Sequence, residues 1–296
     1  MKRETLPIFN IDEFKYKGKG DEFYANDLTS HVKEHEKTIL VPHRHNFYMS
    51  VLFTKGTGTH VIEFNKYSIQ PGKVFMMMPG QVHNWKLSKD TEGYIFFHSK
   101  DFFDLNFTFE RVSSYPFFSC LRNTPEIILN KSSCKPVERI YRDILEEYHQ
   151  NKVLKFQKIT SLINLLYINL SREYIPGNMH NYQHLSYLAR LQQLEELIDN
   201  HFRTDKYPKS YAEMMHISVK HLNRICKTCI NKTVSELISD RIILEAKRMM
   251  AFSKNNIAEI TDDLGYIDNS YFARLFKKKT GKTPSDFIYS INNKLL

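Results

Sequence analysis

The sequence predicts a two-domain α+β fold, with an N-terminal β-barrel and flanking helices followed by an all-α C-terminal domain. Short β-branched and aromatic runs occupy the first third, two amphipathic helical patterns follow, and the pattern after about residue 186 is helical throughout. The 296 residues suffice for two domains with separate cores, and 42% hydrophobic with 25% charged residues is a globular composition.

Four β-rich runs in the first third are predicted strands. They are residues 48–53, 60–64, 74–78 and 94–97. Turn signals rich in Gly and Pro separate them, at residues 55–58, 70–72 and 79–80. Short strands at such close spacing indicate a sandwich or a small barrel.

Two amphipathic helices are predicted after about residue 136. Apolar residues recur at intervals of three and four from Val137 to Tyr148 and from Ile159 to Leu170. These helices pack on the barrel, or one of them forms a subunit interface, and both alternatives stay open. Pro and Gly then break the pattern, so residues 176–185 are a predicted linker between a domain of residues 1–175 and one of residues 186–296.

Composition excludes several classes of protein. No apolar run approaches the ~18 residues of a membrane span, and the first residues contain no apolar stretch of the kind found in secretory signals. Four cysteines (Cys120, Cys134, Cys226 and Cys229) are too few for a disulfide scaffold and fit a reducing compartment. We therefore expect a cytoplasmic protein with no membrane segment.

The formal charge of +9 is concentrated near the C-terminus. Residues 1–175 contain 24 basic and 20 acidic residues, whereas residues 201–296 contain 17 basic and 10 acidic residues. The densest stretch, residues 271–282, has five basic residues and no acid. Such a stretch is commonly a solvated helix face, and neighbouring motifs decide whether it contacts phosphate instead.

A weak internal duplication lies in this basic region. Residues 222–227 align with residues 272–277 at a spacing of 50, and Arg and Lys recur in the same frame. Each copy has a short helix, a turn and a second, basic helix, with Ser218 in one copy and Asp268 or Asn269 in the other as candidate N-caps. This is the helix-turn-helix pattern, whose second helix enters the DNA major groove.

Polar side chains on one side of each second helix are the candidate DNA contacts. They are Lys220, Asn223, Arg224 and Lys227 in the first copy and Ser270, Arg274, Lys277 and Lys278 in the second. Arg, Asn and Ser can contact base edges, whereas Lys mainly neutralises phosphate. Residues 241–250 form a predicted linking helix, which would hold the two second helices about one DNA turn (~34 Å) apart.

Residues 265–287 closely resemble the C-terminal signature of AraC/XylS-type bacterial transcription regulators, and the resemblance covers about the last 110 residues. It implies a seven-helix domain with two motifs that acts on promoters. It also implies base-edge contacts from the residues that match the family's reading positions. These are Lys220, Asn223 and Arg224 in the first motif, and Asn269, Ser270 and Arg274 in the second.

The first motif departs from the family pattern at three positions. Cys226 replaces the usual Phe, Asn231 replaces a Gly and His216 replaces the turn Gly, and Thr261 in the second motif replaces the usual Ala. Asn tolerates left-handed backbone geometry, so Asn231 is compatible with the pattern.

The N-terminal half resembles the cupin-like sensor domain of the same family, at residues 42–45, 56–58, 71–72 and 79–83. This resemblance implies effector binding and homodimer formation. Inward-facing side chains would form the effector pocket. The candidates are His43, His45, Tyr48, Trp85 and His98. A sugar effector would stack on Trp85.

The histidines also raise the alternative of a metal-dependent cupin enzyme with a helical DNA-docking or packing domain. Three imidazoles, from His43, His45 and His83, can hold Zn²⁺ or Fe²⁺. However, Met49 stands where such enzymes normally supply a carboxylate. Cys226 and Cys229 have the spacing of a pair of zinc ligands, but the sequence offers no second pair of Cys or His residues nearby. We therefore expect no metal, no cofactor and no enzymatic activity.

The combined hypothesis is an effector-responsive transcription regulator. Its expected partners are promoter DNA, a small molecule, a second copy of the chain and RNA polymerase. Effector binding would shift the population competent for two-site DNA binding, which is an allosteric coupling.

Overall fold

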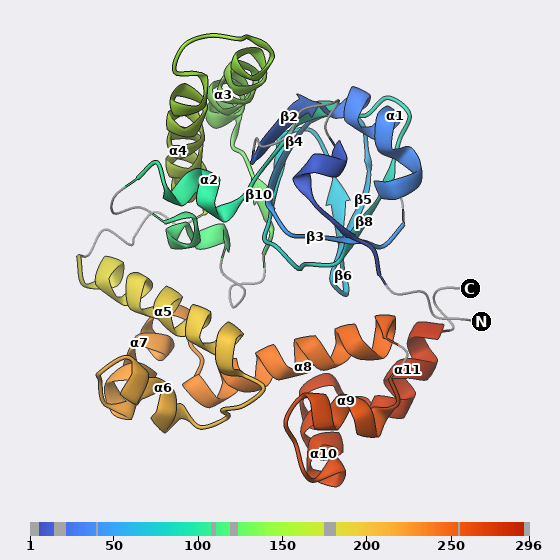
Figure 1. The fold of residues 1–296 in the computed structure, drawn as a ribbon, viewed down its shortest axis with the longest axis vertical. Helices are drawn as coiled ribbons and strands as arrows, with labels where there is room; N and C mark the ends of the chain where they lie inside the picture. The colour runs from blue at the N-terminus through green and yellow to red at the C-terminus, as the bar shows by residue number, and fades with distance from the viewer. Residues whose placement is uncertain are drawn as a thin grey trace. The chain divides into compact units, whose positions relative to one another are not determined.

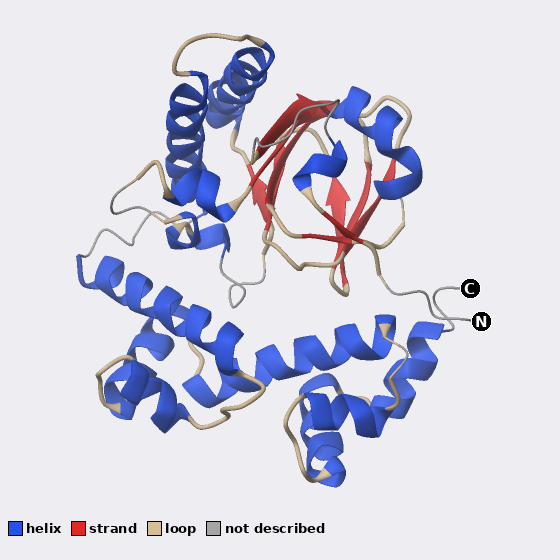
Figure 2. Ribbon diagram, viewed as in Figure 1, coloured by secondary structure: helices blue, strands red, loops and turns tan. Residues whose placement is uncertain are grey.

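The computed structural model describes residues 6–14, 22–39, 41–107, 111–118, 124–174, 182–253 and 255–292. The chain divides into an N-terminal unit, Pro7–Met179, and a C-terminal unit, His180–Leu296 together with Met1–Leu6. Figure 2 shows that every described strand belongs to the first unit, whereas the described part of the second contains helices and loops.

Short strands dominate the N-terminal unit (Figure 1). They are β1 (Ile8–Phe9), β2 (Phe23–Asp27), β3 (Arg44–His45), β4 (Tyr48–Lys55), β5 (Gly58–Ile62), β6 (Asn65–Ile69), β7 (Lys73–Met77), β8 (His83–Leu87), β9 (Glu92–His98) and β10 (Glu126–Ile128). The four predicted strands correspond to β4, β5, β7 and β9.

The predicted barrel is not closed. The described strands pair as three separate sheets, in the orders β1-β3, β10-β7-β4-β9-β2 and β6-β5-β8. β4 lies between β7 and β9 in antiparallel register, whereas β5 pairs with β6 and β8. Because both edges of β5 are paired in this way, β5 cannot also pair with a strand of the five-stranded sheet. The two larger sheets enclose a core between them.

The alternation of side chains along β4 separates two cores. Met49, Val51 and Phe53 lie in the cluster shared with the three-stranded sheet, which includes Ile62 and Trp85. The intervening residues of β4, Tyr48 and Leu52, belong to a second cluster on the opposite face of the five-stranded sheet. The period of two in a strand therefore gives this sheet two buried faces.

Helices and short 3₁₀ turns complete the N-terminal unit. They are η1 (Ile11–Phe14), α1 (Leu28–Ile39), α2 (Lys100–Asp104), η2 (Val112–Ser114), η3 (Pro116–Phe118), α3 (Lys131–His149) and α4 (Lys155–Tyr174). The two predicted amphipathic helices are α3 and α4, which pack on each other and on the outer face of the five-stranded sheet through Ile144, Ile163 and Leu170. A role for either helix as a subunit interface stays a prediction.

The predicted start of α3 was too late. The Asn130 side chain accepts hydrogen bonds from the backbone N–H groups of Ser132 and Ser133, which starts the helix five residues before Pro136.

Helices form the described part of the C-terminal unit. They are α5 (Tyr182–His201), α6 (Pro208–Met214), α7 (Val219–Ile230), α8 (Val234–Phe252), α9 (Ile257–Asp263), α10 (Asn269–Thr280) and α11 (Pro284–Asn292). In Figure 1, α6 and α7 lie towards one end of α8, and α9 to α11 lie towards the other. Of the predicted linker, residues 176–181 lie outside the described residues and residues 182–185 are the first turn of α5.

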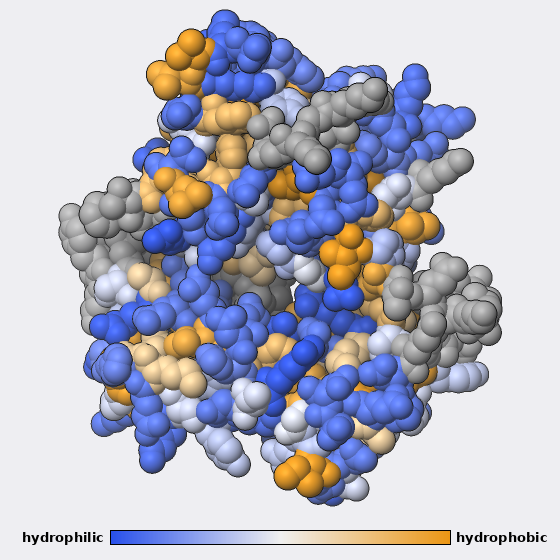
Figure 3. Space-filling model, in the orientation of Figure 1, coloured by the Kyte–Doolittle hydropathy of each residue, from blue (hydrophilic) through white to orange (hydrophobic). Residues whose placement is uncertain are grey.

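The face of the molecule in Figure 3 is mostly hydrophilic, with hydrophobic side chains in small separate groups. Among the described residues, no helix combines the length and the apolar character that crossing a membrane requires.

Candidate nucleic-acid interface and ligand pocket

The first motif consists of α6, a tight turn and α7. Met215 and Leu222 are buried on either side of the turn, and His216 adopts the left-handed conformation with φ of 54°. The Ser218 hydroxyl accepts a hydrogen bond from the backbone N–H of His221 at 3.2 Å, so Ser218 is the N-cap of α7, as predicted.

The second motif has the same layout in α9, a turn and α10. Gly265 is left-handed with φ of 72°, at the position that His216 occupies in the first motif. The N-cap is Asp268, because its Oδ1 accepts from the N–H groups of Ser270 at 2.7 Å and Tyr271 at 3.1 Å. Asn269, the other candidate cap, is the first residue of the helix.

The ends of the two second helices also match. Asn231 after α7 and Gly281 after α10 are both left-handed, with φ of 53° and 78°, and each backbone N–H bonds to the carbonyl four residues earlier. Cys226 is fully buried at the position that Phe276 occupies in α10. The departures of the first motif from the family pattern therefore preserve its backbone geometry and its core.

α10 presents a cationic and polar face. Phe272 and Phe276 are buried on its other side. The five predicted contacts on this helix are all exposed: Asn269, Ser270, Arg274, Lys277 and Lys278. The Arg274 side chain is 71% exposed, and its Nη2 lies 3.9 Å from an Asp268 carboxylate oxygen. This loose ion pair leaves most of the guanidinium open to solvent.

α7 exposes basic side chains but, unlike α10, no short polar side chain among its predicted contacts. Lys220, Arg224 and Lys227 are exposed, as predicted. Both ends of the Asn223 side-chain amide are hydrogen-bonded within the protein. Its Nδ2 donates to the Val219 carbonyl at 3.1 Å, and its Oδ1 accepts from the Val234 N–H at 3.0 Å. The side-chain amide predicted to contact a base instead joins α7 to α8.

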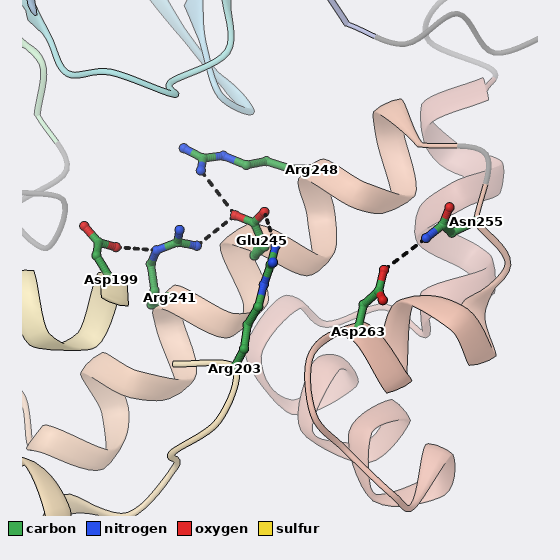
Figure 4. Close-up of polar contacts among 7 residues, drawn as sticks. All are labelled: Asp199, Arg203, Arg241, Glu245, Arg248, Asn255 and Asp263. Carbon is green, nitrogen blue, oxygen red and sulfur yellow. Dashed lines mark hydrogen bonds and ion pairs between the residues drawn. The ribbon is translucent and has the colours of Figure 1, made fainter. Parts of the chain in front are cut away.

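Several basic residues of this unit are neutralised internally. Glu245 on α8 accepts hydrogen bonds from Arg241 Nη1 at 2.9 Å, and from Arg203 Nη2 and Arg248 Nη1 at 3.4 Å (Figure 4). Burial alone would raise the pKa of Glu245, but the surrounding arginines hold it below its usual value. These arginines of α8 and of the loop before α6 are therefore paired within the unit, whereas the basic side chains of α7 and α10 named above are exposed.

A small cavity of about 10 Å³ lies between the two larger sheets of the N-terminal unit. Three predicted effector contacts line it: His43, His45 and Trp85. His31, His83 and Phe97 line it as well. A volume of this size holds about one water molecule, so a larger ligand requires these side chains to move apart.

The cavity histidines are held in defined orientations. His43 Nδ1 donates to the Val41 carbonyl at 2.9 Å, and His45 Nδ1 donates to the Phe47 carbonyl at 2.7 Å, so each Nε2 keeps its lone pair. His83 Nδ1 shares a hydrogen bond with His60 Nε2 at 3.0 Å. Burial lowers the pKa of His45 to about 3, and His45 is therefore neutral at pH 7.

The metal hypothesis finds no support in this geometry. Within the described ranges, no group of three or more His, Cys, Asp or Glu side chains is arranged to hold a metal ion, and this includes His43, His45 and His83. Glu63, which directly follows β5, does not line the cavity and accepts a hydrogen bond from the backbone N–H of Val82 at 3.1 Å.

Two predicted effector contacts do not face the cavity. Tyr48 and His98 lie on the opposite face of the five-stranded sheet, stacked at a ring separation of 5.5 Å beneath α4. His98 Nδ1 donates to the Ser99 carbonyl at 2.7 Å and its Nε2 accepts from the Tyr167 hydroxyl at 2.6 Å. The expectation that they face inward was wrong because they have the strand parity of Leu52 and Phe96, which face the helices.

Two buried histidines of this region were not predicted: His31 lines the cavity, and His60 contacts two of the lining residues, His83 and Trp85. His60 follows from parity, because it shares a face of β5 with the buried Ile62. His31 lies on α1, a helix for which the sequence analysis made no prediction, and its Nδ1 is 2.9 Å from the Tyr24 hydroxyl.

Comparisons with known proteins agree with both units. An AraC-like ligand binding domain matches residues 32–102, and a helix-turn-helix domain matches residues 211–289. The HTH-type transcriptional activator RhaS of Enterobacter sp. (strain 638) is 20% identical over 256 residues, which cover 82% of this chain and 86% of the relative.

Another relative covers more of the chain. The HTH-type transcriptional activator RhaR of Escherichia coli O139:H28 (strain E24377A / ETEC) is 20% identical over 271 residues, 90% of this chain and 94% of its own length. The crystal structure of ToxT from Vibrio cholerae O395 is 12% identical and aligns over 91% of this chain and 98% of that chain, with a TM-score of 0.40. With a ligand-binding domain in its β-rich unit and a helix-turn-helix domain in its helical unit, the chain belongs to the AraC/XylS family of transcription regulators.

Proposed function

We propose that this regulator acts without catalysis, holding promoter DNA against the exposed faces of α7 and α10. The observation that supports this most strongly is the composition of α10. Arg274, Lys277 and Lys278 are exposed beside Asn269 and Ser270, while the aromatic residues of the helix are buried. A rigid helix with cations and short polar side chains on one face matches what the major groove offers.

The two helices have different parts in this proposal. On α10, Arg274 reads a guanine bidentately and Asn269 and Ser270 contact neighbouring base edges, while Lys277 and Lys278 contact phosphate. On α7, Lys220 and Lys227 contact phosphate and Arg224 contacts a base edge. Recognition of sequence thus resides mainly in the second motif, and the linking helix α8 holds the helices about one DNA turn apart.

We place the effector between the two larger sheets of the N-terminal unit. His45 Nε2, His83 Nε2 and Trp85 Nε1 are buried there without a hydrogen-bond partner among the described residues. The indole N–H is a donor, and the His45 Nε2 is an acceptor because its Nδ1 carries the proton. A small molecule with hydroxyl groups, such as a sugar, satisfies both kinds of atom, and Trp85 offers a ring for stacking.

The remaining partners follow from the family's mode of action. We propose a cytoplasmic homodimer that contacts RNA polymerase at the promoter, with α3 and α4 in the dimer contact. Leu165 and Ile168 of α4 are 48% and 40% exposed on the side away from the sheet, so this helix has apolar surface left to bury.

Selection of bound duplexes from a randomised library, followed by mapping of bound genomic sites, tests the proposed function. The wild-type chain should enrich one motif, and Arg274→Ala should lose the preference at one guanine while keeping its helical circular dichroism. Lys209→Ala is the matched control, because Lys209 is 81% exposed and belongs to α6, so it is part of neither second helix. If Arg274→Ala enriches the same motif as the wild type, the assignment of the reading helix is wrong.

A further inference from the structure

Asp240 connects the two helix-turn-helix motifs. It lies in the second turn of α8, and its Oδ2 accepts from Lys232 Nζ at 2.8 Å while its Oδ1 accepts from Lys279 Nζ at 2.8 Å. Lys232 belongs to the turn that follows α7, and Lys279 belongs to the last turn of α10. One carboxylate therefore connects the C-terminal ends of both proposed reading helices.

These contacts are partly shielded from solvent. The exposed fractions of the side chains are 31% for Asp240, 37% for Lys232 and 24% for Lys279. Fully exposed ion pairs have little effect, but partly buried ones with two charge-assisted hydrogen bonds restrict the groups that they join. Without the carboxylate, two ammonium groups would face each other with no anion between them, and their repulsion would favour separation of the two motifs.

A second contact joins the motifs at another point. A Cβ on Gly265, in the turn of the second motif, would lie 2.0 Å from the Arg203 carbonyl oxygen, in the loop between α5 and α6. Next to it, Lys206 Nζ lies 4.8 Å from the centre of the Tyr266 ring. The packing of α10 on α8 and this contact at the turn hold the second motif in place, and the bridge at Asp240 adds a fixed polar contact at the C-terminal end of α10.

We propose that Asp240 is a positioning residue that sets the separation and rotation between α7 and α10, and thereby the spacing of the two DNA segments that the chain accepts. This inference rests on the proposed function, in which both helices enter the major groove. A turn of DNA contains about 10 base pairs, so moving one segment by a single base pair rotates it by roughly 35° about the DNA axis. A rigid pair of motifs cannot follow such a rotation, whereas a loosened pair can.

The experiment compares duplexes that carry the selected site with duplexes in which one or two base pairs are added or removed between the two contacted segments. We expect the wild-type chain to lose about tenfold or more in affinity for each shifted duplex, the loss typical of a mismatched site. Asp240→Asn should lose less than about threefold on the same duplexes. Asp262→Asn is the matched control, since it removes the same charge from an exposed position on α9 and should keep the wild-type profile.

A salt titration gives a second readout that a loss of fold would not produce. Release of Lys232 and Lys279 from Asp240 leaves both free to contact phosphate, so the slope of log Kobs against log[salt] should steepen by about one to two in Asp240→Asn. Asp240→Glu, which restores the charge, should bring both the slope and the spacing profile towards those of the wild type.

Lys279→Met provides a second test if Asp240→Asn folds poorly. It removes the contact between Lys279 and Asp240 and leaves Asp240 paired with Lys232. It should accept shifted duplexes as well. If either folded variant keeps the wild-type dependence on spacing, the positioning role is wrong. If the wild-type chain itself shows no sequence-specific binding, the proposed function fails first.

Discussion

The side-chain Oδ1 of Asn223 accepts a hydrogen bond from the backbone N–H of Val234 at 3.0 Å, and this bond links α7 to the first turn of α8. The first N–H groups of a helix have no partner inside the helix, so a side chain from elsewhere can satisfy them. Val234 is fully buried, which removes water as an alternative partner. Asn223 therefore fixes the angle at which the linking helix leaves the first motif.

Asn223→Ala should destabilise the C-terminal unit. The substitution leaves the buried Val234 N–H without a partner, and a lost bond of this kind costs about 1–3 kcal/mol. Denaturant unfolding followed by far-ultraviolet circular dichroism measures the difference. Asn269→Ala is the control, because Asn269 is exposed on α10 and its loss should weaken DNA binding while leaving the free energy of unfolding unchanged. Equal stability of Asn223→Ala and the wild type would contradict the structural role.

Gly265→Ala should be far more damaging than Gly281→Ala. Both glycines are left-handed, with φ of 72° and 78°, so Ala pays a conformational cost of roughly 1–2 kcal/mol at either position. Only at Gly265 does the new Cβ also meet a backbone atom, the Arg203 carbonyl oxygen at 2.0 Å, whereas nothing lies within 4 Å at Gly281.

Thermal unfolding of the two glycine variants separates conformational strain from collision. We expect Gly281→Ala to unfold a few degrees below the wild type and Gly265→Ala to unfold well below Gly281→Ala. Equal melting temperatures would show that the loop carrying Arg203 moves away at no cost.

Much of this fold was predictable from local pattern, and what was missed depended on tertiary contacts. The two motifs, the cap Ser218 and the left-handed Asn231 follow from residue type and spacing, and the second cap was narrowed to Asp268 or Asn269, because these features depend on neighbouring backbone. The role of Asn223 was not predictable, because its partner Val234 lies beyond a turn and is reached only when α7 and α8 pack together.

The error at Tyr48 and His98 has a different physical cause. Both residues are polar and aromatic, and they lie on strands that were correctly predicted. A strand with one buried face would direct its polar side chains to solvent or to a pocket, but here α3 and α4 bury the second face as well. Residue type then no longer distinguishes the faces, and only the parity with Leu52 and Phe96 does.

Lys278→Ala should weaken binding to all duplexes about equally. Lys278 is exposed near the C-terminal end of α10. Its ammonium group is expected to contact phosphate, which adds affinity without distinguishing one base from another. The slope of log Kobs against log[salt] should fall by about one, and the ratio of specific to non-specific affinity should stay constant. Lys209→Ala on α6 serves as the control with an unchanged slope. A selective loss at one base pair would instead place Lys278 among the base-reading residues.

The N-terminal unit should lose stability as the pH falls below about 6.5. Burial lowers the pKa of His31 and His45 to about 3 and that of His98 to about 4, whereas these groups titrate near 6.5 when the chain unfolds. Between these limits the unfolded chain binds more protons than the folded one. Stability is therefore complete above pH 6.5 and falls with pH by up to about 1.4 kcal/mol per pH unit for each such histidine.

Trp85 reports this loss, because it is the only tryptophan of the sequence and is buried between the two sheets. Denaturant unfolding followed by its fluorescence at several pH values between 5 and 6.5 gives the slope. His98→Gln retains a donor and an acceptor for Ser99 and Tyr167 but does not titrate, so its slope should be smaller than that of the wild type by up to about 1.4 kcal/mol per pH unit. His149→Gln, at an exposed position on α3, should keep the wild-type slope. Identical slopes for His98→Gln and the wild type would mean that His98 is not held neutral beneath α4.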